Sequence, residues 1–149
     1  MKLSIDTSIF VDVLKKRVVA SSKSLFDSLL RENEGFISSI TVAELSVGAH
    51  LSPMSDAIEK TRDSISLVFV INLSKGIAFM GGEIYSRLVR KGLEIELNDC
   101  LIAATSLSTG ISEIVTRNMD HFERIEDIKP VMHARRFEFL DRRTRCIFS

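Results

Sequence analysis

The chain has 149 residues and a mass of 16.7 kDa, and its 45% hydrophobic and 27% charged residues suffice for one buried core and exclude wholesale disorder. Its 20 Lys and Arg residues balance its 20 Asp and Glu residues, which excludes binding to polyanions by bulk charge alone. Two cysteines without metal-ligand spacing exclude a disulfide-rich scaffold and a zinc finger, and they fit a reducing compartment.

Short apolar segments alternate with helical patterns along the whole chain. The predicted strands span residues 3–5, 35–38, 67–71 and 114–116. The predicted helices span residues 9–16, 21–31, 41–50, 53–64, 74–91 and 99–108. Strands separated by helices of this length predict the α/β class, with a central parallel sheet covered by helices on both faces, a three-layer α/β/α sandwich.

The charge is distributed unevenly between the body of the chain and its end. Residues 129–149 contain six basic and two acidic side chains, whereas residues 1–128 contain fourteen basic and eighteen acidic ones. Pro130 marks the predicted end of the compact part. We therefore expect a folded domain over residues 1–130 and a basic C-terminal extension over residues 131–149, which either is a solvated tail or contacts a partner.

The amino terminus and the apolar runs give no sign of targeting. An acid at position 6 comes before a signal-peptide core could form. The longest apolar runs are also far shorter than the roughly 20 residues that a helix needs to cross a bilayer. We expect a cytoplasmic protein with no membrane segment.

Polar side chains gather where the predicted strands end, and ligands bind at that edge of parallel sheets. Asp6 directly follows the first strand, and Asn118 and Asp120 follow the last. Glu44 and Asp99 lie early in two of the predicted helices. Taken singly, Asp6 could be a helix cap, Glu44 a rim residue reaching solvent, and Asp99 a first-turn acid stabilised by the helix dipole.

Glu44 is the most informative of these acids. It lies on the same helical stripe as Ile40, Val47 and Leu51, and the helix around it contains no Lys or Arg. Burying a carboxylate costs several kcal/mol unless it is paired or bound to a cation. Converging carboxylates without basic neighbours indicate a divalent ion, and oxygen ligands suit Mg²⁺ or Mn²⁺. Such an ion can hold a phosphodiester and activate water.

Four segments in order resemble the PIN domain, and within it the VapC toxins of prokaryotic toxin–antitoxin pairs. They are Ile5-Asp6-Thr7-Ser8, Ile40-Thr41-Val42-Ala43-Glu44-Leu45 with Gly48, Asn98-Asp99-Cys100-Leu101-Ile102-Ala103-Ala104-Thr105, and Val115-Thr116-Arg117-Asn118 with Phe122. The resemblance spans residues 3 to about 125 and implies a Mg²⁺-dependent endoribonuclease. It also implies a homodimer and a VapB-type antitoxin whose tail blocks the acidic site.

The resemblance also assigns residues. Asp6, Glu44 and Asp99 match the three family acids and would bind the metal, with Glu44 acting as a water-mediated ligand or a general base. Asn118 matches the fourth position, with Asp120 as the alternative. Relatives often carry an Asp three residues beyond that position, where this chain has His121.

Three further residues are predicted to bind substrate. Thr7 and Thr116 match family hydroxyl positions and would hydrogen-bond the carboxylates or the RNA. Arg117 is placed to contact a phosphate. His50, His121 and His133 have no ligand spacing, so structural or surface roles are expected for them.

Two other functions remain as alternatives. A non-catalytic PIN-like module would bind RNA or a protein without needing the acids. An aspartyl-phosphate phosphatase would use Asp6 as the nucleophile, but that chemistry generally requires a second acid two residues later, where this chain has Ser8.

Overall fold

The computed structural model describes residues 1–15, 20–29 and 31–132. Within them five strands form one sheet: β1 (Lys2–Ile5), β2 (Glu34–Ser38), β3 (Phe69–Ile71), β4 (Glu113–Val115) and β5 (Lys129–Val131). The helices are α1 (Thr7–Leu14), α2 (Ala20–Leu29), α3 (Ser39–Leu51), α4 (Ala57–Ile65), α5 (Lys75–Arg90), α6 (Leu97–Ser108) and α7 (Met119–Glu123).

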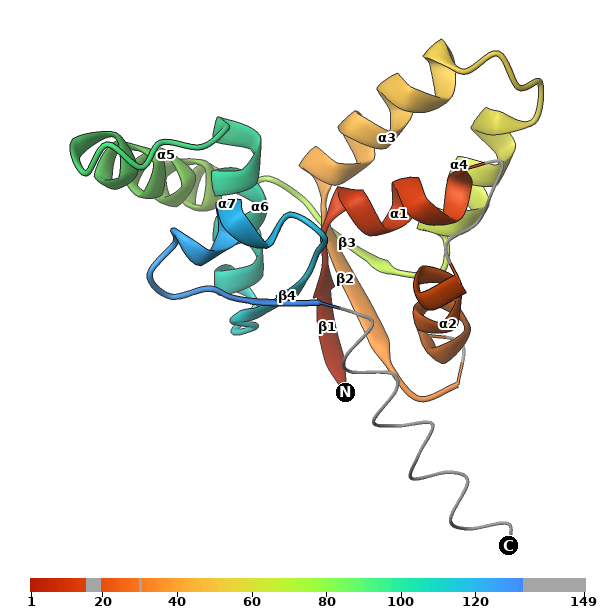
Figure 1. Cartoon of the computed structure of the whole chain (residues 1–149), viewed down its shortest axis with the longest axis horizontal. Helices are drawn as coiled ribbons and strands as arrows, with labels where there is room; N and C mark the ends of the chain where they lie inside the picture. Colours follow the sequence, from red (N-terminus) through yellow and green to blue (C-terminus); the bar gives the residue numbers. More distant parts are fainter. Residues whose placement is uncertain (16–19, 30, 133–149) are drawn as a thin grey trace, which may run out of the picture.

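The sheet has the strand order β3-β2-β1-β4-β5, and every neighbouring pair is parallel. Parallel neighbours require crossover connections, which the helices provide. Helices α1 to α4 lie on one side of the sheet and α5 to α7 on the other (Figure 1). The prediction of a three-layer α/β/α sandwich is confirmed.

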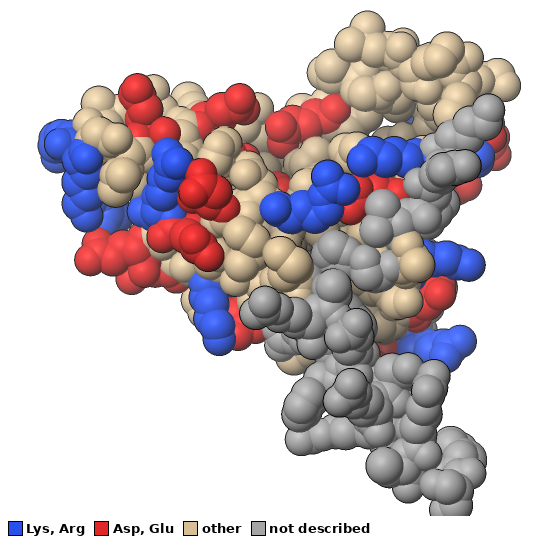
Figure 2. Space-filling model, viewed as in Figure 1, with Lys and Arg blue, Asp and Glu red and all other residues tan. Residues whose placement is uncertain are grey.

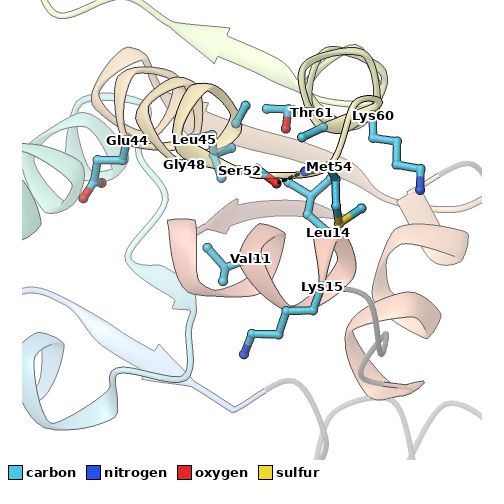
Figure 3. A pocket seen from close by; sticks show the side chains of 12 residues that line it. Val11, Leu14, Lys15, Glu44, Leu45, Gly48, Ser52, Met54, Lys60 and Thr61 are labelled. Carbon is cyan, nitrogen blue, oxygen red and sulfur yellow. Dashed lines mark hydrogen bonds between the residues drawn. The ribbon is translucent and has the colours of Figure 1, made fainter.

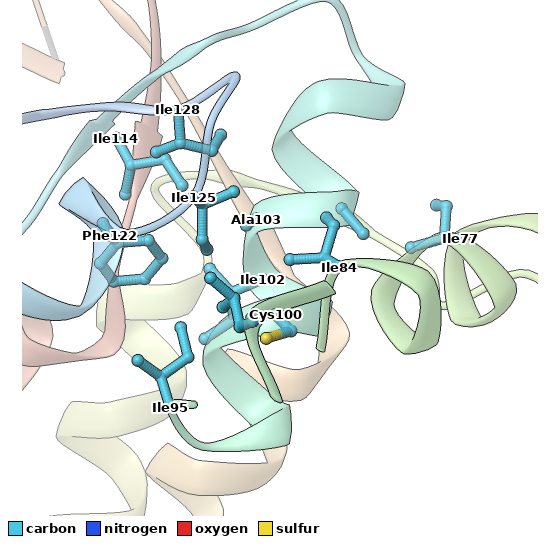
Figure 4. Packing of buried hydrophobic residues seen from close by; sticks show 12 residues of the cluster. Ile77, Ile84, Ile95, Cys100, Ile102, Ala103, Ile114, Phe122, Ile125 and Ile128 are labelled. Atoms are coloured by element: carbon cyan, nitrogen blue, oxygen red, sulfur yellow. The ribbon is translucent and has the colours of Figure 1, made fainter. Parts of the chain in front are cut away.

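The hydrophobic core is divided by the sheet because successive strand side chains point to opposite faces. In β4, Ile114 packs with α5, α6 and α7, whereas Val115 packs with α1, α2 and α3. The first cluster is drawn in Figure 4, where Phe122 of α7 lies against Ile114. Phe122 and Ile114 are both fully buried, so the short helix α7 is anchored to the sheet.

Two elements were not predicted. Helix α7 has five residues, too few to give a periodic pattern. Strand β5 contains Pro130, which was interpreted as the end of the compact part but is the middle residue of this edge strand, paired with Ile114. Proline is tolerated there because an edge strand needs hydrogen bonds on one side only. The rest of the basic extension, from residue 133, lies outside the described residues.

Gly81 allows α5 and α6 to approach each other closely. A Cβ atom at Gly81 would lie 2.5 Å from Leu101 Cδ2 and 3.3 Å from Leu101 Cα, whereas one at Gly82 would meet nothing within 4 Å. We expect Gly82→Ala to stabilise the protein by up to about 1 kcal/mol through helix propensity. Gly81→Ala should destabilise it relative to Gly82→Ala by about 1–3 kcal/mol, because Leu101 must move. Urea unfolding of both variants measures the difference, and equal stabilities would contradict the close packing.

Candidate functional site

Asp6, Glu44 and Asp99 come from three segments that meet at the carboxyl edge of the sheet. Asp6 follows β1 and is the N-cap of α1, Glu44 lies on α3, and Asp99 lies in the first turn of α6. The charge of Asp6 acts on both other carboxyls, and that of Asp99 acts on Glu44. The simpler interpretations of Asp6 as a helix cap and of Asp99 as a first-turn acid are also correct. Both residues therefore also stabilise the N-termini of their helices.

Asp6 is almost fully buried and is held through one oxygen. The Ser8 hydroxyl donates to Asp6 Oδ2 over 2.7 Å, and the Thr116 hydroxyl donates to the same oxygen over 2.9 Å. The backbone N–H of Ser8 adds a longer contact of 3.4 Å to Oδ2. Among the described residues, all the hydrogen bonds to this carboxylate therefore end on Oδ2. The other oxygen, Oδ1, is left for another ligand.

Glu44 is held in a similar way. The Thr7 hydroxyl donates to Glu44 Oε1 over 2.9 Å. Burial raises the pKa of the Glu44 carboxyl, the Thr7 hydrogen bond opposes this rise, and the negative charges of Asp6 and Asp99 add to it.

Asp99 has a partner that the sequence did not predict. His121 Nδ1 lies 2.6 Å from Asp99 Oδ2, although a structural or surface role was expected for this histidine. Burial raises the pKa of the Asp99 carboxyl most strongly, the hydrogen bond from His121 opposes this, and the charges of Asp6 and Glu96 raise it further. No spacing rule would find the pair, because the two residues are 22 positions apart and meet only through the packing of α6 and α7.

These carboxylates could hold a hard cation, although they do not form a closed cage. Among the described residues no Lys or Arg makes a salt bridge with Asp6, Glu44 or Asp99. In the same part of the chain, no three acid, histidine or cysteine side chains converge tightly enough to form a ready-made metal site. An oxygen-rich, partly open donor set fits Mg²⁺ or Mn²⁺, which retain several water ligands.

The remaining predicted residues have different surroundings. The Asp120 side chain is 78% exposed and pairs with Arg124 over 2.8 Å, so it turns outward. Asn118 is half-buried, and its backbone N–H donates to the Thr116 hydroxyl over 2.8 Å. The structure thus ties Asn118, rather than Asp120, to the hydrogen-bonded chain that ends on Asp6.

Arg117 does not point at the three acids. Its guanidinium forms an ion pair with the fully buried Asp12 carboxylate, and its backbone N–H donates to the Ser8 hydroxyl over 3.1 Å. Asp12 also accepts hydrogen bonds from Ser22 and Lys15. The residue predicted to contact a phosphate therefore ties α1 to the segment after β4.

An apolar groove begins beside the acidic edge, between α1, α3 and α4. It has a volume of about 190 Å³, and Val11, Leu14, Leu45, Gly48 and Met54 line it. Glu44 lies at one end of the groove, and Lys15 and Lys60 border it (Figure 3). The far end of α3 presents no charged side chain (Figure 2), and Leu51 there is 80% exposed.

The raised pKa of Glu44 predicts a pH-dependent stability. A carboxyl with a raised folded-state pKa contributes stability below its ordinary pKa and loses that contribution as the pH rises through the raised value. Metal-free Glu44→Gln should therefore melt a few degrees above the wild type at pH 7, and the gain should vanish near pH 4. Thermal melts of both proteins across this range measure the gain, and Mg²⁺ should reduce it at pH 7. A gain that is independent of pH would contradict the prediction.

A five-stranded parallel sheet with acids at its carboxyl edge is the arrangement expected of a PIN domain, and the PIN domain model matches residues 3–128. The chain belongs to the PIN-domain family. Within that family it is similar to the VapC proteins. Ribonuclease VapC2 of Rickettsia felis is 32% identical over 125 residues, which are 83% of this chain and 92% of that protein. The tRNA(fMet)-specific endonuclease VapC of Salmonella typhimurium is 35% identical over 94 residues, which are 62% of this chain and 70% of that protein.

Solved structures agree with this assignment. A chain of the VapBC2 complex from Rickettsia felis, bound to a DNA fragment from its promoter, has a TM-score of 0.77 and 30% identity, covering 88% of this chain and 98% of that one. A chain of DNA-bound VapBC from Salmonella typhimurium has a TM-score of 0.76 and 29% identity, covering 88% and 97%. No helix in the described part of this chain is long and apolar enough to cross a membrane.

Proposed function

We propose that this protein is a Mg²⁺-dependent endoribonuclease that acts as the toxin of a toxin–antitoxin pair. The observation that carries the proposal is the convergence of Asp6, Glu44 and Asp99 at one sheet edge without a Lys or Arg salt bridge among the described residues. A scaffold protein has no physical need for mutually repelling acids that are partly or almost fully buried. Relatives named as ribonuclease and endonuclease support the same chemistry.

The chain's own residues have distinct roles in this reaction. Asp6 and Asp99 would hold the cation, with Mn²⁺ as a possible substitute for Mg²⁺. When bound, the ion supplies positive charge for the phosphate oxygens and lowers the pKa of a nearby water. Glu44 would accept the proton of the attacking water, a task for which its raised pKa is suited. The Thr7 hydroxyl holds the Glu44 carboxylate in place for that proton transfer. The Thr116 hydroxyl holds the Asp6 carboxylate in place for binding the cation.

The apolar groove is the proposed docking site of a VapB-type antitoxin. Its lining is mainly apolar, and Glu44 at its end connects it to the acidic edge. An amphipathic segment lying in the groove would place its next residues over the carboxylates and block them. Similar chains come from VapBC complexes, which supports this partner.

We also propose that the chain forms a homodimer. Helix α5 exposes apolar side chains outside the two core clusters, Phe79 by 82% and Val89 by 44%. Exposed apolar side chains of this size are candidates for a subunit interface. Light scattering on the purified chain measures the oligomeric state, and a monomer at micromolar concentration would contradict the dimer.

RNA cleavage tests the proposed function directly. Purified full-length protein is incubated with total RNA in Mg²⁺, in Mn²⁺ and in EDTA, and the new 5′ ends are mapped. We expect discrete cleavage sites with either metal and none in EDTA. Binding of RNA without cleavage in either metal would favour the non-catalytic module instead.

A further inference from the structure

His121 contacts Asp99 directly. It lies in the last turn of the short helix α7, and its neighbour Phe122 is fully buried in the core. The His121 side chain is 32% exposed and that of Asp99 is 15% exposed, so their contact of 2.6 Å is partly shielded from water. The imidazole is therefore positioned by the packing of α7 rather than by the acid that it contacts.

The chemistry of the two groups defines the direction of the hydrogen bond. An ionised carboxylate can only accept, so His121 Nδ1 carries the hydrogen and donates it to Asp99 Oδ2. This bond restrains rotation of the carboxylate and leaves Oδ1 for another ligand. A short contact to an ionised acceptor is among the stronger hydrogen bonds in proteins.

The same arrangement recurs at all three acids. Asp6 is held through Oδ2 by two hydroxyls, Glu44 through Oε1 by the Thr7 hydroxyl, and Asp99 through Oδ2 by His121. Each carboxylate thus has at least one oxygen that accepts a hydrogen bond from a neighbouring side chain. The donors at Asp6 and Glu44 are hydroxyls, together with the Asn98 side chain at Glu44, so the imidazole at Asp99 is the exceptional member of the set.

We propose that His121 is a positioning residue of the cation site, which orients Asp99 through the Nδ1–H donor. The proposal rests on the proposed function, because it assumes that Asp99 is a metal ligand. It differs from a purely structural role, in which the contact would only tie α7 to α6. Residues that hydrogen-bond ligating groups typically change metal affinity by 10–100-fold when they are removed.

Calorimetric titration of Mn²⁺ into metal-free, full-length protein distinguishes the two roles without using RNA. His121→Ala removes the donor and should weaken Mn²⁺ binding by about 10-fold or more. His121→Asn places an amide N–H near the position of Nδ1 and should bind within about threefold of the wild type. Glu123→Gln, an exposed change on the same helix, is the matched control and should bind like the wild type.

Thermal melts of the metal-free variants accompany each titration. A His121→Ala protein that melts earlier but binds Mn²⁺ as tightly as the wild type would show a structural tie only and would overturn the proposal. Equal weakening in His121→Ala and His121→Asn would overturn the donor argument. A wild type that binds no Mn²⁺ would overturn this proposal together with the metal-dependent nuclease, whereas wild-type binding with an unaffected His121→Ala would overturn this proposal alone.

Discussion

Asp99→Asn and Asp6→Asn are each expected to reduce Mg²⁺-dependent RNA cleavage by at least about 100-fold while the fold stays intact. Each change removes one negative charge and one carboxylate oxygen from the set that would hold the cation. In metal-free buffer both variants should melt a few degrees above the wild type, because the three acids repel one another. Initial cleavage rates and melting temperatures of the same preparations measure both effects.

Asp56→Asn is the matched control for these substitutions. Asp56 is the N-cap residue of α4, its side chain is 47% exposed, and it pairs with Lys60 over 2.8 Å rather than with any residue of the acidic site. The variant should cleave RNA at the wild-type rate and gain no stability. Wild-type cleavage by either Asp6→Asn or Asp99→Asn would exclude the nuclease mechanism described above.

The layers of the fold and the location of the acids could both be predicted from the sequence, because both follow from the alternation of strands and helices. Strands such as residues 35–38 are short apolar runs between helical patterns, and that alternation allows only a few parallel arrangements. The carboxyl ends of parallel strands share one edge, so Asp6 after β1 had to lie near the segment after β4. Glu44 was noticed because a charge on an apolar helical stripe needs a counter-charge, but the stripe itself does not face the core, since Val47 and Leu51 are 59% and 80% exposed.

Other features depend on contacts between distant parts of the chain and leave no local pattern. Asp12 pairs with Arg117 across 105 positions, and this pairing turns the arginine away from the predicted role at the acids. Asp99 meets His121 only because α7, itself too short to predict, packs its Phe122 into the core. Strand β5 was not predicted because it contains Pro130. A proline usually indicates the end of a regular element, whereas here it lies within an edge strand.

Gly48→Leu is expected to weaken binding of a VapB-type antitoxin by about 100-fold, or ~2.7 kcal/mol. Gly48 lines the apolar groove, and a Cβ atom there would meet nothing within 4 Å, so a leucine side chain can extend into the space the antitoxin would fill. The helix itself should not suffer, because leucine has a higher helix propensity than glycine by up to about 1 kcal/mol. Titration of the cognate antitoxin into each purified protein measures the affinity.

Gly82→Leu separates occlusion of the groove from the general effect of the substitution. Gly82 is also a helical glycine whose added Cβ atom would meet nothing within 4 Å, but it lies on α5, on the opposite side of the sheet. Both variants should gain stability, and only Gly48→Leu should lose antitoxin affinity. If Gly48→Leu bound the antitoxin as tightly as Gly82→Leu did, the groove between α1, α3 and α4 would not be the docking site, and the antitoxin would have to reach the carboxylates from another direction.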